Sequence, residues 1–430
     1  MSIFRLVFAF LILCVTPITF ALPSIEKNIT EYINSEKIPQ LALLEKLVNI
    51  NSGTMNIEGV KAVGEILRPE FEALGFKTRW VNEPESMQRA PTLIAEHPGT
   101  QGKRILLIGH LDTVFAKTSP FQKYERKGDI AKGPGVVDDK GGDVVILYAL
   151  KALQAAHALD KANITVVLTG DEEDSGKPTS LSRKPLFDAA SKNDIALDFE
   201  GSITLDTATI ARRGISSWVI TTTGNEAHSS NIFQPTAGFG AIFELTRILN
   251  TMREDLSNEK YLTFSPGLMV GGTTITLDKN NSEATILGEK NVIAKTALAK
   301  GDLRFLTKEQ KLAAQKKIEA IVNKHLPGTN ATVTFQDAIP GMAPTAGNLD
   351  LLKKYSAVSQ DLGYGEVKAY DPALRGAGDI SHIASLVSAS LSGLGALGTG
   401  LHSEKETLTI QYLPIQTERA AVLIYRLIQD

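Results

Sequence analysis

The feature that most constrains the fold is a set of short runs that are apolar on both faces of a strand. Ile105–Gly109, Ile164–Thr169 and Ile195–Phe199 are runs of this kind, and segments with helical spacing separate them. A strand that is apolar on both faces must be covered on both faces, as happens in parallel sheets whose crossover connections are helices. The pattern predicts an α/β fold with a mainly parallel sheet sandwiched by helices.

The pattern of polar and apolar residues along the chain changes near Arg213. Ser217–Thr223 alternates like a half-exposed strand, and Ala237–Met252 and Lys308–His325 have the spacing of amphipathic helices. This order of elements suits a small α+β domain inserted into the larger one, and 430 residues are enough for more than one core. We expect a main domain built from residues 22–212 and 327–430, with an inserted α+β domain at 213–326.

The first residues predict an export signal. A positive charge in Met1–Arg5 precedes the unbroken apolar run Leu6–Val15, and Thr19–Ala21 resembles a small-x-small cleavage site. We therefore expect residues 1–21 to be a signal peptide and the mature chain to be secreted or periplasmic. An uncleaved membrane anchor is the alternative, although the apolar run is shorter than the ~20 residues that a membrane span needs.

Charge and cysteine usage exclude several kinds of partner and site. Lys and Arg total 45 and Asp and Glu 48, and no basic stripe stands out, so we expect no nucleic-acid partner. Cys14 is the only cysteine and precedes the predicted cleavage point, so the mature chain has no thiolate nucleophile or thiolate metal ligand. No other stretch is apolar enough to cross a bilayer, so we expect no membrane association after signal cleavage.

Histidines and carboxylates gather where the predicted strands end. His110 follows one strand, and Asp112 is placed to accept a hydrogen bond from its second ring nitrogen. The four successive acids Asp171–Asp174 follow another strand, and a cation would explain such a concentration of like charge. In α/β sheets, ligands bind at the carboxyl ends of the strands. Three further clusters of this kind are Gly133–Gly142 with its adjacent aspartates, Leu197–Glu200, and Gly400–Glu406.

Two histidines and several carboxylates without cysteine predict a site for one or two divalent ions such as Zn²⁺. A bridged pair of ions about 3.5–4 Å apart would activate a water and polarise a carbonyl, which is the chemistry of amide hydrolysis. A structural calcium site is the alternative, but hard cations do not favour the imidazoles of His110 and His402.

At these residues the chain resembles a known family. Gly109–Val114, Gly133–Gly142, Asp171–Glu173, Phe199–Glu200 and Gly400–Ser403 resemble, in this order, the motifs of the di-zinc exopeptidase and deacylase family. That family contains glutamate carboxypeptidase (carboxypeptidase G), acetylornithine deacetylase and succinyl-diaminopimelate desuccinylase. The resemblance covers essentially the whole mature chain and implies a zinc exopeptidase-like fold and two Zn²⁺ per chain.

The resemblance implies a role for each motif residue. Glu172 falls on the general base and Asp112 on the residue that orients His110, and the Asp138–Asp139 peptide would be cis. The implied metal ligands are His110 and Glu200 for one zinc, Glu173 and His402 for the other, and Asp138 bridging both.

The predicted insert carries a further motif. Gly224–Ser230 resembles the family's Gly-x-x-Ala-His-Ser sequence, whose histidine, His228 here, reaches the active site of the partner subunit and helps to stabilise the tetrahedral oxyanion. Asn291 and Arg304 match positions that bind the free carboxylate of the substrate. The resemblance thus implies a homodimer, with the insert serving as lid and dimerisation domain, that acts on a small peptide or an N-acyl amino acid.

Some assignments stay open. Asp198 shares a strand face with Glu200 and could replace it as a ligand, and the segment after Glu173 departs from the family's usual Gly-Ser continuation. Arg375 is a candidate for recognising a glutamate side chain.

The expected function is that of an exported zinc-dependent carboxypeptidase of the glutamate carboxypeptidase type. An N-acyl amino acid deacylase or a dipeptidase with the same chemistry is the alternative. A catalytically silent metal-binding protein is a different class, but such a scaffold would not require the extra carboxylate of Glu172 beside a ligand.

Overall fold

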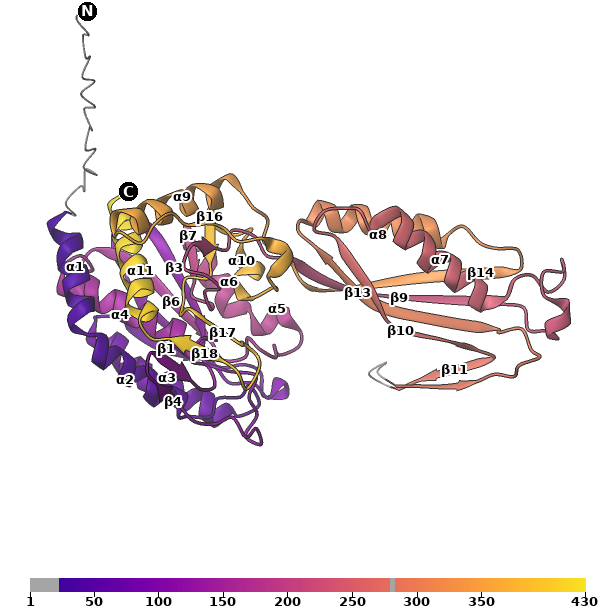
Figure 1. Ribbon diagram of the computed structural model, residues 1–430, viewed down its shortest axis with the longest axis horizontal. Helices are drawn as coiled ribbons and strands as arrows, with labels where there is room; N and C mark the ends of the chain where they lie inside the picture. The colour runs from indigo at the N-terminus through magenta and orange to yellow at the C-terminus, as the bar shows by residue number, and fades with distance from the viewer. Residues whose placement is uncertain (1–22, 279–282) are drawn as a thin grey trace, which may run out of the picture.

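The computed structural model describes residues 23–278 and 283–430, so the predicted signal peptide lies outside the described residues. The described chain forms a main unit and a smaller second unit that projects from it (Figure 1). Within the described ranges, no helix is both long and apolar enough to cross a membrane.

A six-stranded sheet forms the centre of the main unit. Its first three strands in spatial order pair antiparallel, and the strands from the third onward pair parallel. The mainly parallel α/β fold is therefore confirmed. In spatial order the strands are β1 (Lys77–Val81), β2 (Thr92–His97), β6 (Ala162–Thr169), β3 (Gln101–His110), β7 (Ile195–Asp198) and β16 (Ala389–Ser392).

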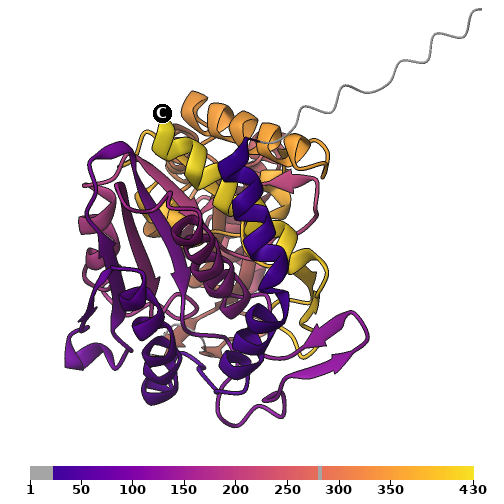
Figure 2. The ribbon, with the colours of Figure 1, turned by 90° about the vertical axis from the view of Figure 1, so that its left-hand side faces the viewer.

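Alternate residues of these strands enter two different cores, which explains why the strands are apolar on both faces. Ile105 and Leu107 of β3 belong to the larger core, whereas Leu106 and Ile108 face the smaller one. Figure 2 shows the main unit toward the viewer, with helices beside the sheet. The larger core includes residues of α1 (Ser24–Ser35), α2 (Lys37–Val48), α3 (Ile57–Ala73), α4 (Lys140–Ala155), α9 (Ala346–Asp361) and α11 (Tyr412–Gln429), and the smaller core includes residues of α6 (Lys184–Ala190) and α10 (Asp379–Ile383).

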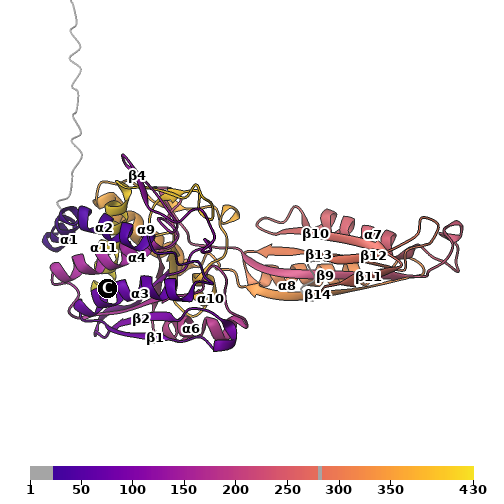
Figure 3. The same ribbon diagram turned by 90° about the horizontal axis from the view of Figure 1, so that it is seen from below.

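The second unit is an antiparallel sheet with two helices on one face (Figure 3). Its own core combines Trp218 and Ile220 from the sheet with Leu245 and Ile318 from the helices. The strands, in spatial order, are β10 (Thr263–Gly272), β13 (Thr296–Phe305), β9 (Gly214–Gly224) and β14 (Thr329–Ile339); the helices are α7 (Gly240–Leu256) and α8 (Lys308–Val322), and β11 (Thr274–Leu277) and β12 (Ala284–Leu287) form a separate hairpin.

The second unit extends beyond residue 326, where the sequence placed its end. β14 pairs with β9 from Thr329↔Gly224 to Ile339↔Ile215, and Ala331 packs into the core under the helices. The predicted boundary of 213–326 is therefore too short, and residues 329–339 do not belong with the rest of 327–430 in the main unit. The alternation of polar and apolar residues in this segment is typical of a half-buried strand.

The two connections between the units lie side by side. The backbone N–H of Arg212 donates to the carbonyl of Met342 (3.0 Å), and the N–H of Met342 donates to the carbonyl of Arg212 (2.9 Å).

The remaining short elements are β17 (Gly398–Thr399), β18 (Thr407–Thr409), β5 (Ile130–Lys132) and β4 (Glu125–Lys127) in one sheet, β15 (Lys368–Ala369) with β8 (Thr207–Ala208), and the short helix α5 (Thr179–Ser182).

Candidate active site

The candidate site lies where three neighbouring parallel strands end. His110 is the last residue of β3, the acidic run begins just after β6, and Glu200 follows β7. Because β6, β3 and β7 are adjacent and parallel, their carboxyl ends meet at one edge of the sheet. Asp138 precedes α4, and His402 lies between β17 and β18.

The carboxylate of Asp138 lies between two histidines. Its Oδ1 is 3.1 Å from His110 Nε2, and its Oδ2 is 3.0 Å from His402 Nε2. Glu200 Oε1 lies 3.8 Å from the same nitrogen of His110, and Glu173 Oε2 lies 3.2 Å from that of His402. Each oxygen of one carboxylate thus faces its own pair of histidine and glutamate, as expected for two cations that share a bridging ligand.

The chemistry of this donor set fits a pair of divalent cations. Burial and the charge of Glu200 raise the pKa of Glu172 well above its usual value, so the carboxylates here repel one another. Hydrogen bonds to Asp138 and Glu173 raise the pKa of His402 to about 11, so the cluster favours positive charge between its carboxylates. Imidazole and carboxylate together suit zinc and its neighbours.

Asp112 orients His110 and also holds the loop that follows β6. His110 Nδ1 lies 3.2 Å from Asp112 Oδ1, so Nε2 is the nitrogen that faces Asp138. The backbone N–H groups of Glu172 and Glu173 donate to the same Asp112 carboxylate at 3.0 and 3.2 Å, and Thr54 Oγ1 donates at 2.6 Å. Asp112 therefore fixes the first histidine relative to two of the acids.

Glu172 lines a cavity of about 260 Å³ beside the histidines and carboxylates. One of its oxygens lies within 4.8 Å of ligand atoms of both His110 and Glu200, so distance alone would also allow it to be a ligand. Its carboxylate makes no hydrogen bond to another residue in the described part of the chain, whereas Asp138 and Glu173 both face His402. This leaves Glu172 available to a water molecule in the cavity.

The geometry favours Glu200 over Asp198 as a ligand. Arg212 Nη2 lies 3.2 Å from Glu200 Oε2, so the other oxygen of Glu200 faces His110. Asp198 Oδ2 instead lies 3.7 Å from the same guanidinium nitrogen. Arg212 was not predicted as a site residue from the sequence. The only feature that marks it there is its position where the pattern of polar and apolar residues changes.

Arg375 lies in the wall of the same cavity. Its Nη2 donates to the carbonyl of Gly201 at 2.8 Å and lies 3.7 Å from Glu200 Oε2. Only 9% of its surface is exposed, and its Nε is buried without a hydrogen-bond partner among the described residues. The wall of the cavity therefore contains a guanidinium group.

Glu406 anchors the loop that carries Asp138. Its carboxylate accepts hydrogen bonds from the backbone N–H groups of Gly135 (3.2 Å), Val137 (2.9 Å) and Asp138 (3.1 Å). The Asp138–Asp139 peptide is cis, as the resemblance implied. Glu406 belongs to the last sequence cluster, but no local pattern predicts this role, because its three partners are distant along the chain.

A second anchor, Arg183, holds the loop around Glu172. The guanidinium donates to Asp171 Oδ1 and to Asp379 Oδ1, both at 2.5 Å, and its side chain is fully buried. It also donates to the carbonyl of Asp171 and to Ser175 Oγ, both at 2.9 Å. Arg183 thus connects the segment on either side of the two glutamates with the start of α10.

The residues expected in the insert do not all lie together. His228 and Asn291 are neighbours, since Ser229 N donates to the Asn291 carbonyl at 2.8 Å. Both lie beyond the far end of β9, whose 11 residues start at the junction and span about 36 Å.

Arg304 lies at the opposite end of the second unit. It pairs with Ile215 beside the junction and its Nε donates to Asp302 Oδ2 at 2.8 Å. Within one chain, Asn291 and Arg304 therefore cannot hold the same carboxylate in the arrangement described here.

Comparisons with known proteins agree with this geometry. Residues 106–426 match the peptidase family M20/M25/M40. Carboxypeptidase G2 of Pseudomonas sp. is 30% identical over 389 residues, which cover 89% of this chain and 87% of the relative. Succinyl-diaminopimelate desuccinylase of Novosphingobium aromaticivorans is 27% identical over 341 residues, which cover 75% and 84% of the two chains.

Solved structures share the fold at low sequence identity. Aminopeptidase PepT of Bacillus cereus has a TM-score of 0.69 at 16% identity, covering 93% of this chain and 98% of its own. The metallo-carboxypeptidase Sso-CP2 of Sulfolobus solfataricus has a TM-score of 0.62 at 17% identity, covering 90% and 99%. The extent of the family match and the similarity to carboxypeptidase G2 show that this chain is a metallohydrolase that belongs to peptidase family M20/M25/M40.

Proposed function

We propose that the protein is a di-zinc hydrolase that cleaves an amide bond and releases a C-terminal amino acid. The observation that carries the proposal is the Asp138 carboxylate, whose two oxygens each face a separate pair of histidine and glutamate. Glu172 lies beside them in the same cavity, as a general base requires.

The proposed chemistry divides between the cations and the protein. His110, Asp138, Glu173, Glu200 and His402 would hold the two ions, which would supply polarisation of the amide carbonyl and activation of the attacking water. Glu172 takes a proton from that water and passes it to the leaving amine. Asp112 keeps Nε2 of His110 directed at the site, and Arg212 keeps one oxygen of Glu200 turned toward it.

The position of Arg375 supports the proposal that the released product is a C-terminal residue. A guanidinium in the wall of this cavity favours an anionic group, and a free α-carboxylate is such a group. Release of glutamate in particular is the finer proposal, supported by the similarity to carboxypeptidase G2. An N-acyl amino acid deacylase is the second candidate, because its products also carry a free carboxylate and a desuccinylase is among the relatives.

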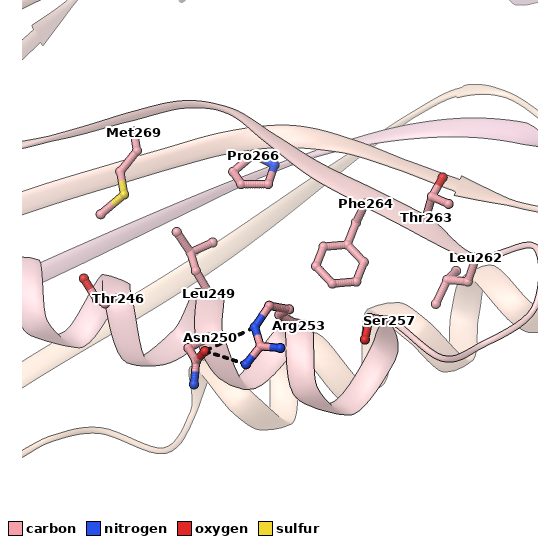
Figure 4. Close-up of a pocket in the computed structure, with 10 residues that line it drawn as sticks. All are labelled: Thr246, Leu249, Asn250, Arg253, Ser257, Leu262, Thr263, Phe264, Pro266 and Met269. Carbon is pink, nitrogen blue, oxygen red and sulfur yellow. Dashed lines mark hydrogen bonds between the residues drawn. The ribbon is translucent and has the colours of Figure 1, made fainter.

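We also propose that the protein works as a homodimer through the second unit. His228 lies too far from the metal ligands of its own chain to act there, which favours a role in a second copy. β10 is an edge strand, and a groove of about 510 Å³ lies between it and α7, with Leu249, Phe264 and Met269 in its lining (Figure 4). An edge strand beside an apolar groove suits an interface between two copies.

We also propose that the protein is exported to the periplasm or the medium. It rests on the charge, apolar run and cleavage-like site in residues 1–21. N-terminal sequencing of the protein secreted by its host would find Leu22 as the first residue if the signal is cleaved after Ala21.

Metal analysis combined with one substitution tests the catalytic proposal. The purified protein should contain about two zinc ions per chain, and chelation should abolish hydrolysis of N-acyl amino acids until Zn²⁺ is returned. Glu172→Gln should keep the zinc and lose at least ~10²-fold in kcat, the lower end for general acid–base catalysis. Near-normal kcat in this variant would refute the role of Glu172, and zinc binding without hydrolysis in the unaltered protein would identify a silent metal-binding protein instead.

A further inference from the structure

A second, larger pocket adjoins the metal ligands through Glu173. Its volume is about 590 Å³, against about 260 Å³ for the cavity that contains Glu172 and Arg375. This is within the usual range for a site that binds a small organic group. Its walls come from residues 53–56 and 113–118, with Glu173 and Asp174 at one side.

The two walls are joined by backbone hydrogen bonds. Thr54 N donates to the Thr113 carbonyl at 3.2 Å, and Thr113 N donates to the Ser52 carbonyl at 2.9 Å. A Cβ at Gly53 would lie 2.3 Å from the Phe115 carbonyl oxygen, so only glycine allows this close approach. Since the Thr54 hydroxyl also donates to Asp112, the pocket is built into the same framework that orients His110.

The pocket combines an apolar surface with one available cation. Met55 is 61% exposed and Val114 is 40% exposed, and both are in the lining. Of the two acids, Glu173 faces His402, and Asp174 pairs with Arg89 at 2.6 Å. Lys117 makes no ion pair with any residue in the described ranges, so its ammonium group is available to a ligand.

We propose that this pocket binds the acyl side of the substrate and favours an acyl group with an apolar body and a terminal carboxylate. This inference rests on the proposed function, in which the C-terminal amino acid occupies the smaller cavity next to Arg375. The scissile amide then lies at Asp138 and Glu172, and the acyl group continues past Glu173. Met55 and Val114 contact the apolar body, and Lys117 pairs with the carboxylate.

A matched pair of substrates tests the inference. The 4-carboxybenzoyl and 4-methylbenzoyl derivatives of one amino acid differ only in the group that would meet Lys117. The unaltered protein should have the higher kcat/KM for the carboxylated substrate. Lys117→Met should lower this preference about fivefold, the upper end for an ion pair open to solvent, and raised salt should lower it too. Lys123→Met, an exposed lysine outside the lining, is the matched control and should leave the preference unchanged.

The outcomes separate the inference from the proposed function. Zinc-dependent hydrolysis of both substrates with an equal preference in Lys117→Met and the unaltered protein would overturn the inference and leave the proposed function standing. An equal loss of kcat/KM for both substrates in Lys117→Met would also overturn the inference, because the lysine would then not recognise the acyl carboxylate. No zinc-dependent hydrolysis of any N-acyl amino acid by the unaltered protein would refute the proposed function itself.

Discussion

Replacing Arg183 with methionine should destabilise the main unit more than any exposed ion pair could. Arg183 is fully buried, and its guanidinium is the partner of Asp171 and Asp379, whose side chains are 1% and 5% exposed. Burial alone would raise the pKa of Asp379, but the charge of Arg183 holds that pKa below its ordinary value. Without the arginine, two carboxylates would remain buried and uncompensated.

The expected loss is about 3–5 kcal/mol, the usual effect of removing one partner of a buried ion pair. That is a large share of the roughly 5–15 kcal/mol that stabilises a typical folded protein. Urea unfolding of the full chain, followed by circular dichroism, measures it. Trp218 lies in the second unit and Trp80 on β1, so fluorescence in Trp218→Phe and Trp80→Phe backgrounds reports on each unit separately and assigns the loss to the main unit.

Two further variants make the test decisive. Arg68→Met removes a partly exposed arginine that pairs with Glu72 at the surface, and should cost no more than about 1 kcal/mol. Adding Asp171→Asn and Asp379→Asn to Arg183→Met removes the uncompensated charges and should recover part of the loss. A cost for Arg183→Met as small as that of Arg68→Met would refute the view that this arginine holds the loop around Glu172.

Three further experiments test the assignments of the site. Mixing Glu172→Gln chains with His228→Ala chains should restore activity if His228 acts in the partner subunit; no recovery despite proven subunit exchange would argue against it. If Arg304 holds the free carboxylate together with Arg375, Arg304→Lys should raise KM for substrates with a free C-terminal carboxylate and barely affect amidated analogues; equal effects on both would leave that carboxylate to Arg375 alone. Glu406→Gln should weaken zinc retention about 10- to 100-fold, measured by competition with a chelator, while the fold is kept; unchanged affinity would show that the Asp138 loop does not need its anchor.

The sequence was sufficient for the parts of the site that local patterns encode. His110 and Glu200 follow apolar strands, and the order of parallel strands brings such positions together whatever the details of packing. The mainly parallel sheet could be predicted from the same strands. Both faces of each strand are apolar, so each face needs a core of its own to cover it.

The anchoring residues could not be found in this way. Arg183, Arg212 and Glu406 act through partners that are remote along the chain, such as Asp379 for Arg183 and the 135–138 loop for Glu406. A single buried arginine has no periodicity, and its pairing depends on the finished packing. The end of the second unit was misplaced for a different reason: β14 is an edge strand with one exposed face, so only alternate residues are apolar and the signal is weaker than the continuous apolar run of a central strand.

The paired connections at Arg212 and Met342 bear on how the main unit tolerates a long interruption. Bringing together the ends of a flexible segment costs conformational entropy that grows with its length. Here the interruption closes its own ends, because β9 and β14 begin and finish side by side, with Ile215 opposite Ile339. Once the second unit has folded, the loop-closure entropy that the main unit loses no longer depends on the length of the interruption. For the main unit, the interruption is then equivalent to a short hairpin. The main unit can therefore accommodate inserted sequence at this point with little loss of its own stability.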